Sequence, residues 1–233
     1  MFFLEMAKIS AGSHDLNRWL HGGYEDDVIS VIYGGSGTGK TNFCLLAAVS
    51  QAKKGHKVIY VDTEGGFSSE RVKQLAPEHT KETLEHVLLL TPTNFAEQKQ
   101  AFEKLRIYLK QEVALIVVDG MTMLYRLDFA SAREKDTQSI QSVNAELVRQ
   151  LRTLAEIARK RQIPVLVTNQ IYNWENETKM VGGDILRYWG KCLIELTHES
   201  GKRTAHLRKH RSLPESSLQF QIVQDGIRKR GWL

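Results

Sequence analysis

One stretch decides the fold: Gly34-Gly35-Ser36-Gly37-Thr38-Gly39-Lys40-Thr41, which matches the pattern G-x-x-x-x-G-K-[ST] at every fixed position. An apolar run precedes it and an amphipathic pattern follows it, as expected for a strand, a loop and a helix that together bind phosphate. The glycines let the backbone turn its N–H groups inward, where they and the positive end of the helix meet phosphate oxygens. The alternative is a flexible glycine loop without a ligand.

The motif assigns roles to individual side chains. We expect Lys40 to reach the β- and γ-phosphates of ATP and the Thr41 hydroxyl to bind Mg²⁺. The candidate nucleotide-binding residues are residues 34–41 and Asn42, which is the next residue of the helix. The apolar run at residues 115–118 ends in Asp119, which is the expected second ligand of Mg²⁺, directly or through water.

A further carboxylate follows the next apolar run, in Tyr60-Val61-Asp62-Thr63-Glu64-Gly65-Gly66-Phe67. This stretch falls at the carboxyl end of a predicted strand, where parallel sheets bind ligands. A carboxylate there orients and polarises the attacking water, so Glu64 is the candidate general base. The alternative is an acid that caps a helix or closes a turn.

The hydrophobic pattern predicts an α/β fold around a parallel sheet. Five apolar runs indicate buried strands, and amphipathic stretches between them indicate helices on both faces of the sheet. The strands are expected at residues 28–33, 57–62, 86–90, 113–119 and 163–169, and the helices at 41–54, 69–75, 95–110 and 136–161. After residue 190, short strands at 192–197, 204–207 and 218–223, joined by turns such as Glu199-Ser200-Gly201, predict an antiparallel C-terminal edge.

Composition limits the class of protein. With 233 residues, 42% hydrophobic and 25% charged, the chain is expected to form one globular domain over residues 1–233. Two cysteines allow no disulfide framework and no zinc-ligand spacing, which fits a reducing, cytoplasmic compartment. We expect no signal peptide and no membrane association, since apolar runs fall short of the roughly 18 residues that a span needs.

The net charge of +5 is concentrated at one end of the chain. Residues 201–233 hold eight Lys or Arg against two acids, a net charge of +6, so the remaining chain is nearly neutral. Such asymmetry favours a surface that faces a polyanion. The alternative is an ordinary solvated basic edge.

These motifs in order resemble the RecA/RadA recombinase superfamily and, within it, the archaeal RadB-type branch. The resemblance covers nearly the whole chain, and it includes Ile9-Ser10-Ala11-Gly12-Ser13, Asp62-Thr63-Glu64-Gly65, Val167-Thr168-Asn169-Gln170 and Gly182-Gly183. It implies a RecA-like P-loop ATPase core. Residues 1–24 form a short leading segment, with no N-terminal helix-hairpin-helix domain expected before the core.

The resemblance also implies roles for residues outside the P-loop. Gln170 would sense the γ-phosphate and couple the nucleotide to the segment that follows. Arg71 would stack on adenine, and its alternative is a solvated helix arginine. Residues 121–135 would be a first DNA-binding loop with Arg126 and Arg133 as phosphate contacts. Residues 171–184 would be a second DNA-binding loop, with Lys179 as a candidate DNA contact. In this loop Trp174 would either stack on a base or pack on the domain.

Two departures from the family pattern bear on function. The second loop carries Glu175 and Glu177, and acids oppose binding to a phosphate backbone. Arg208-Lys209-His210-Arg211 is cationic where the family carries an acidic residue and a proline. This cluster is expected to bind DNA, or to place Lys209 or Arg211 against the nucleotide of a neighbouring subunit, or to be a solvated edge.

The sequence thus predicts an ATP- and DNA-binding protein of homologous recombination and DNA repair, a recombinase paralogue or mediator without full strand exchange. Since related ATPases complete their site at a subunit interface, we expect weak, DNA-independent hydrolysis. Single-stranded or branched DNA is the expected partner. A full-length RadA-type recombinase, a recombination nuclease and a second copy of the chain are further candidates. The alternative is a RecA-fold ATP switch or scaffold that does not bind DNA. A small-molecule P-loop kinase is disfavoured because no arginine-rich lid follows the core.

Overall fold

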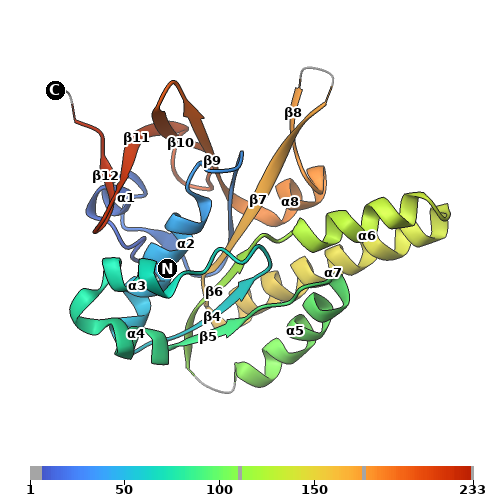
Figure 1. Cartoon of the computed structure of the whole chain (residues 1–233), viewed down its shortest axis with the longest axis horizontal. Helices are drawn as coiled ribbons and strands as arrows, with labels where there is room; N and C mark the ends of the chain where they lie inside the picture. Colours follow the sequence, from blue (N-terminus) through green and yellow to red (C-terminus); the bar gives the residue numbers. More distant parts are fainter. Residues whose placement is uncertain (1–6, 110–111, 175–176, 232–233) are drawn as a thin grey trace, which may run out of the picture.

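Strand β3 (Ile29–Gly34) lies near the middle of a mixed sheet and leads directly into the glycine-rich loop. The computed structural model describes residues 7–109, 112–174 and 177–231. In this part of the chain the main sheet runs in the order β12-β11-β10-β9-β3-β7-β6-β4-β5, and β8 pairs with β7 (Figure 1). The other strands of this sheet are β4 (Lys57–Asp62), β5 (Val87–Leu90), β6 (Val113–Asp119), β7 (Val165–Trp174), β8 (Glu177–Met180), β9 (Gly190–Glu199), β10 (Lys202–Lys209), β11 (Ser216–Val223) and β12 (Gly226–Lys229).

The pairing confirms the predicted fold class. Strands β5, β4, β6, β7, β3 and β9 are parallel to their neighbours, whereas β9, β10, β11 and β12 form an antiparallel edge. The central strands are rich in Val and Ile and are buried on both faces, which explains their continuous apolar runs. A small separate ladder pairs β1 (Lys8–Ile9) with β2 (Tyr24–Glu25).

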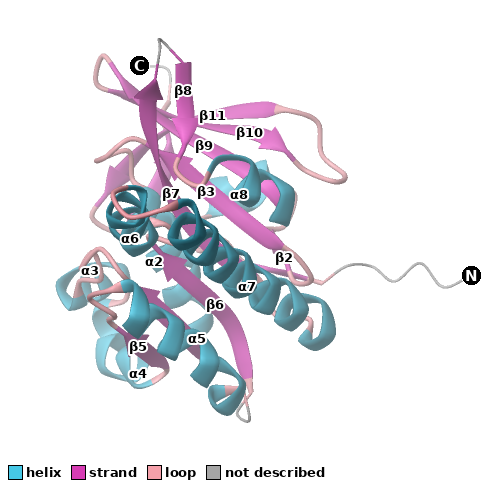
Figure 2. Cartoon of the chain, turned by 90° about the vertical axis from the view of Figure 1, so that its right-hand side faces the viewer, coloured by secondary structure: helices cyan, strands magenta, loops and turns pink. Residues whose placement is uncertain are grey.

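Helices cover both faces of the sheet. One buried cluster joins the sheet to α1 (His14–Trp19), α2 (Lys40–Ala52) and α3 (Ser69–Leu75), beside which lie a 3-10 turn (Pro77–His79) and α4 (Thr80–Glu85). A second cluster joins the other face to α5 (Phe95–Tyr108), α6 (Met123–Arg133), α7 (Thr137–Arg161) and α8 (Gly183–Trp189). Figure 2 shows α5, α6 and α7 on the near side of the sheet. None of the helices in the described ranges is long and apolar enough to cross a membrane.

Both predicted DNA-binding loops are instead regular structure. Residues 121–135 were expected to form a loop, but residues 123–133 form α6, which packs along α7 and projects with it beyond the sheet (Figure 1). Residues 171–184 were also expected to form a loop. Instead, β7 continues to Trp174 and β8 returns beside it, with Ile171 opposite Met180. The chain then enters α8 at Gly183.

Candidate functional site

The glycine-rich loop joins β3 to α2 at the carboxyl end of the parallel sheet. Gly37 and Gly39 have φ values of 72° and 112°, in the left-handed region that favours glycine. The Lys40 ammonium is buried and donates to the carbonyl oxygens of Gly34 and Gly35 at 3.0 and 2.9 Å. Burial lowers the pKa of Lys40, while the charges of Glu64 and Asp119 oppose this shift. The loop therefore keeps its lysine inside the phosphate cradle.

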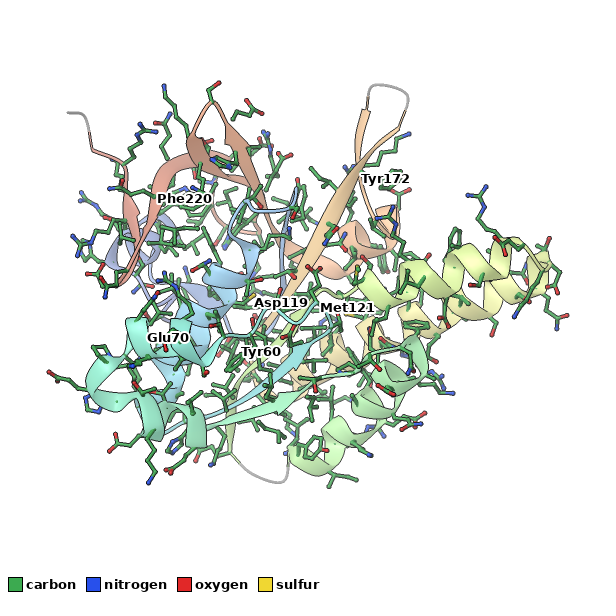
Figure 3. The ribbon with its side chains drawn as sticks, viewed as in Figure 1. Tyr60, Glu70, Asp119, Met121, Tyr172 and Phe220 are labelled. Carbon is green, nitrogen blue, oxygen red and sulfur yellow. The ribbon has the colours of Figure 1, made fainter. Side chains whose placement is uncertain are left out.

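Asp119 is buried at the end of β6 and is held by hydroxyl groups from three elements. Tyr60 donates to its Oδ2 at 2.9 Å and Thr168 to its Oδ1 at 2.6 Å. Burial raises the pKa of Asp119, and the hydrogen bonds from Thr168, Thr41 and Tyr60 lower it. Tyr60 and Asp119 lie close together in the centre of the molecule (Figure 3). Sequence reasoning did not single out Tyr60 or Thr168, because hydroxyl residues in a strand carry no motif of their own.

Glu64 lies on the loop after β4, and the preceding acid shapes that loop. The Asp62 carboxylate accepts hydrogen bonds from the backbone N–H groups of Glu64, Gly66 and Phe67 at 2.8–3.1 Å. The Gln170 amide donates to both carboxylate oxygens of Glu64 at 3.2 Å. Burial raises the pKa of Glu64, and the hydrogen bond from Gln170 lowers it. The candidate base and the candidate phosphate sensor are thus in direct contact.

The residues present fit a nucleotide with Mg²⁺. Thr41 and Asp119 supply a hydroxyl and a carboxylate, both oxygen ligands of the kind that Mg²⁺ prefers. Across residues 7–109, 112–174 and 177–231, no group of three or more His, Cys, Asp or Glu side chains could hold a metal alone. Mg²⁺ would therefore share its coordination with nucleotide phosphates, as in other P-loop sites.

The comparisons with known proteins agree with this geometry. The sequence model of the Rad51 family matches residues 4–230. The chain belongs to the Rad51 family. Among its relatives are proteins named DNA repair and recombination protein RadB. The one from Methanococcus maripaludis (strain C7) is 37% identical, over 91% of this chain and 96% of its own length. The relative from Methanocaldococcus jannaschii is 37% identical, over 91% and 98%. That from Methanobrevibacter smithii is 39% identical, over 91% and 92%.

Arg71 contacts the first turn of α2, directly after the glycine-rich loop. Its guanidinium donates to Asn42 Oδ1 at 2.9 Å and to the carbonyl oxygens of Gln224 and Val223 at 2.8 and 2.9 Å. It therefore links α3 to α2 and to the turn between β11 and β12. Its stacking on adenine stays a prediction.

The candidate DNA contacts from the two predicted loops lie on α6 and on the hairpin of β7 and β8. Arg126 and Arg133 are exposed on α6, and Lys179 is exposed on β8. Tyr172, 39% exposed on the hairpin, is an additional aromatic that sequence reasoning did not single out (Figure 3). The side chains of Trp174 and Glu177, and the whole of Glu175, lie outside the described residues.

The cationic cluster at residues 208–211 does not present four free charges. Arg208 pairs with Glu195 at 2.7 Å, and Lys209 donates to the carbonyl oxygens of Arg187 and Gly190 at 3.0 and 2.9 Å. Arg211 pairs with Glu25 at 3.0 Å and also with Asp27. The His210 side chain is only 2% exposed, and burial lowers its pKa, so it is the member least suited to carry charge.

A basic cavity of about 220 Å³ nevertheless opens beside this cluster. It is lined by Asp27, Val28, Arg159, Lys191, Lys209, His210 and Arg211. Val28 precedes β3 and Lys191 is the second residue of β9, so the cavity lies at the amino end of the parallel strands. The glycine-rich loop lies at the opposite end, which leaves Lys209 and Arg211 away from the nucleotide of their own chain. Arg159 and Lys191 come from distant parts of the sequence, and sequence reasoning missed them.

Proposed function

We propose that this chain is an ATP-binding, DNA-binding protein of homologous recombination and DNA repair, a recombinase paralogue or mediator with weak ATP hydrolysis and without full strand exchange. The observation that carries the proposal is the contact between Gln170, which lies within β7, and Glu64. Because β7 continues from Gln170 into the exposed hairpin, one strand connects the nucleotide site to a candidate DNA-binding element, so that bound nucleotide would affect DNA binding. Such coupling does not require DNA to speed hydrolysis, because it is reciprocal for binding and not for kcat.

The nucleotide site supplies the chemistry that hydrolysis needs. Lys40 would bind the β- and γ-phosphates, and Glu64 would accept a proton from the attacking water. Mg²⁺ held by Thr41 and Asp119 would neutralise phosphate charge. On this proposal a single chain leaves one side of the site in contact with water, which weakens each electrostatic interaction and makes turnover slow.

Two surfaces support DNA binding. Arg126 and Arg133 on α6 and Lys179 on β8 are exposed cations on elements that project from the core. The cavity with Arg159, Lys191 and Lys209 supplies a second cluster of positive charge. Lysine and arginine side chains that replace counterions on the phosphate backbone give sequence-independent affinity for DNA. A RadA-type recombinase or a recombination nuclease is the partner class proposed for a mediator.

The second candidate function is a nucleotide-dependent switch or scaffold that does not bind DNA. The observation that favours it is the internal pairing of Arg208 and Arg211 with Glu195, Glu25 and Asp27, which removes positive charge from the surface.

Paired binding measurements separate the two functions. ATP binding by the wild type, by Lys40→Ala and by Lys53→Ala, an exposed lysine just after α2, tests the nucleotide site. We expect only Lys40→Ala to weaken binding, by about tenfold to a hundredfold, since it removes charged hydrogen bonds to phosphate. Fluorescence anisotropy with a labelled single-stranded oligonucleotide then tests DNA binding. ATP binding without DNA binding at low salt would favour the switch, and a folded wild type that binds neither would refute both functions.

A further inference from the structure

The antiparallel edge of the sheet forms a wall against the glycine-rich loop. A Cβ added at Gly39 would lie 3.0 Å from Ile222 and 3.8 Å from Phe220, both on β11. Phe220 is labelled in Figure 3. It packs edge-to-face on Phe43 of α2, with the ring centroids 5.3 Å apart. Strand β11 therefore packs against both the glycine-rich loop and the helix that follows it.

One cation on this wall touches the loop. The Arg203 guanidinium donates from Nη2 to the carbonyl oxygen of Gly37 at 3.4 Å. Side chains alternate along a strand, so Arg203 points to the same face as the buried Ala205 and Leu207, which pack in the cluster that contains α2. Arg203 is thus directed toward the loop, whereas its neighbour Lys202 is exposed.

Within the described residues, the hydrogen bond to Gly37 is the only one found for the Arg203 side chain. Its Nε is buried and has no hydrogen-bond partner in the described structure. None of the ion pairs found within the described ranges includes Arg203, in contrast to Arg208 and Arg211 nearby. A buried donor without an acceptor is unfavourable, and a guanidinium without a counter-ion attracts anions. The anion that this loop is built to hold is a polyphosphate.

We infer that Arg203 is a positioning residue of the nucleotide site, which holds the tip of the glycine-rich loop through Gly37 and adds positive charge behind the phosphates of a nucleoside di- or triphosphate. The inference rests on the proposed binding of nucleotide by the same loop. Gly37 has a φ of 72°, and a Cβ added there would meet nothing within 4 Å, so nothing packs against that side of the loop tip. A donor to its carbonyl oxygen restrains the peptide plane and with it the direction of the neighbouring N–H groups.

The test is the affinity of the full chain for ADP, ATP and AMP in the variants Arg203→Met, Arg203→Lys and Lys202→Met. Arg203→Met and Lys202→Met remove the same charge from neighbouring positions, so their difference isolates the contact with the loop. We expect Arg203→Met to weaken ADP and ATP binding about tenfold, since a charge-assisted hydrogen bond is lost. AMP binding should change less than twofold, Lys202→Met should match the wild type, and Arg203→Lys should recover part of the loss because it restores the charge.

If Arg203 only stabilised the fold, its variants would differ in thermal stability and not in their affinity for nucleotide. The midpoint of thermal unfolding without nucleotide is measured for each variant, and affinity is compared among variants that are folded at the assay temperature. Equal affinities for Arg203→Met and Lys202→Met would overturn the inference, and so would an equal loss for AMP and ADP. If the folded wild type binds no ATP or ADP, the proposed nucleotide function fails as well. If the wild type binds them and Arg203→Met binds equally well, only the role of Arg203 fails.

Discussion

The Tyr60 hydroxyl donates a hydrogen bond of 2.9 Å to Oδ2 of Asp119, and both residues are almost fully buried. The contact joins β4 to β6 beneath the glycine-rich loop. It fixes one oxygen of the proposed Mg²⁺ ligand before any nucleotide arrives, while Thr168 fixes the other. A ligand that is oriented in advance loses less conformational freedom on binding.

Replacing Tyr60 by Phe should therefore weaken Mg²⁺-dependent ATP binding. The buried carboxylate loses one donor, which we expect to cost about 1 kcal/mol of stability and to raise the Mg²⁺ requirement several-fold. Tyr125→Phe is the matched control, because it removes another buried hydroxyl, one that donates to Asn144 at 2.7 Å on the opposite face of the sheet. ATP affinity measured across a Mg²⁺ titration tests this. The same Mg²⁺ dependence in both variants would contradict the role of Tyr60.

Gly120 should not tolerate a side chain. Its φ is 91°, and a Cβ there would lie 2.3 Å from Thr63 Oγ1 and 2.7 Å from Glu64 Cγ. We expect Gly120→Ala to displace Glu64, to abolish hydrolysis and to destabilise the fold by at least about 1–3 kcal/mol. Gly201→Ala is the control, since Gly201 has a φ of 71° but open space around it. Chemical denaturation and an ATPase assay measure both effects, and equal behaviour of the two variants would exclude a steric cause.

As the pH is lowered, ATP hydrolysis should be lost at a pH above the ordinary pKa of a glutamate. Burial raises the pKa of Glu64, and the Gln170 amide opposes that rise by bonding to the charged form. As the pH falls through this raised pKa, Glu64 takes up a proton and can no longer accept one from water. Gln170→Met removes the opposing hydrogen bond, so the acid limb of a single-turnover pH profile should move to higher pH. An unchanged or lower limb would show that Gln170 does not act on the base.

The cavity at the amino end of the strands should contribute to DNA binding through Arg159 and Lys191, two cations that line it together with the Asp27 carboxylate. Arg159→Ala combined with Lys191→Ala should reduce the slope of log affinity against log salt by up to about 2. Lys73→Ala combined with Lys81→Ala removes the same charge from exposed positions on α3 and α4. Equal slopes for the two double variants would remove this cavity from the DNA-binding surface.

Much of the fold could be predicted because its signals are local. The run at residues 113–119 is apolar up to Asp119, and β6 has these bounds. The hydrophobic period of residues 136–161 likewise matches α7. The family resemblance predicts a loop at residues 121–135, but Leu124, Tyr125 and Ala132 recur at helical spacing and are buried in α6. The apolar run ends at residue 169, so it does not predict the hairpin, in which the apolar residues Ile171 and Met180 pair across the two strands.

The contacts of the site that the sequence does not predict join residues far apart in the chain. Arg71 meets the carbonyl oxygen of Gln224, 153 positions later, and Arg203 meets that of Gly37, 166 positions earlier. Arg211 pairs with Asp27, 184 positions earlier, so the carboxylate balances a positive charge that the sequence predicted to contact DNA. A backbone carbonyl carries no signature in the sequence, so such partners emerge only once the sheet order is known.

Steady-state ATP hydrolysis by the pure chain at low salt, with and without single-stranded DNA, tests the central claim most directly. The account predicts slow turnover that DNA leaves nearly unchanged and that Glu64→Gln removes. Rapid turnover strongly stimulated by DNA would contradict it, since DNA bound at the hairpin would then act through Gln170 on Glu64 within a working recombinase.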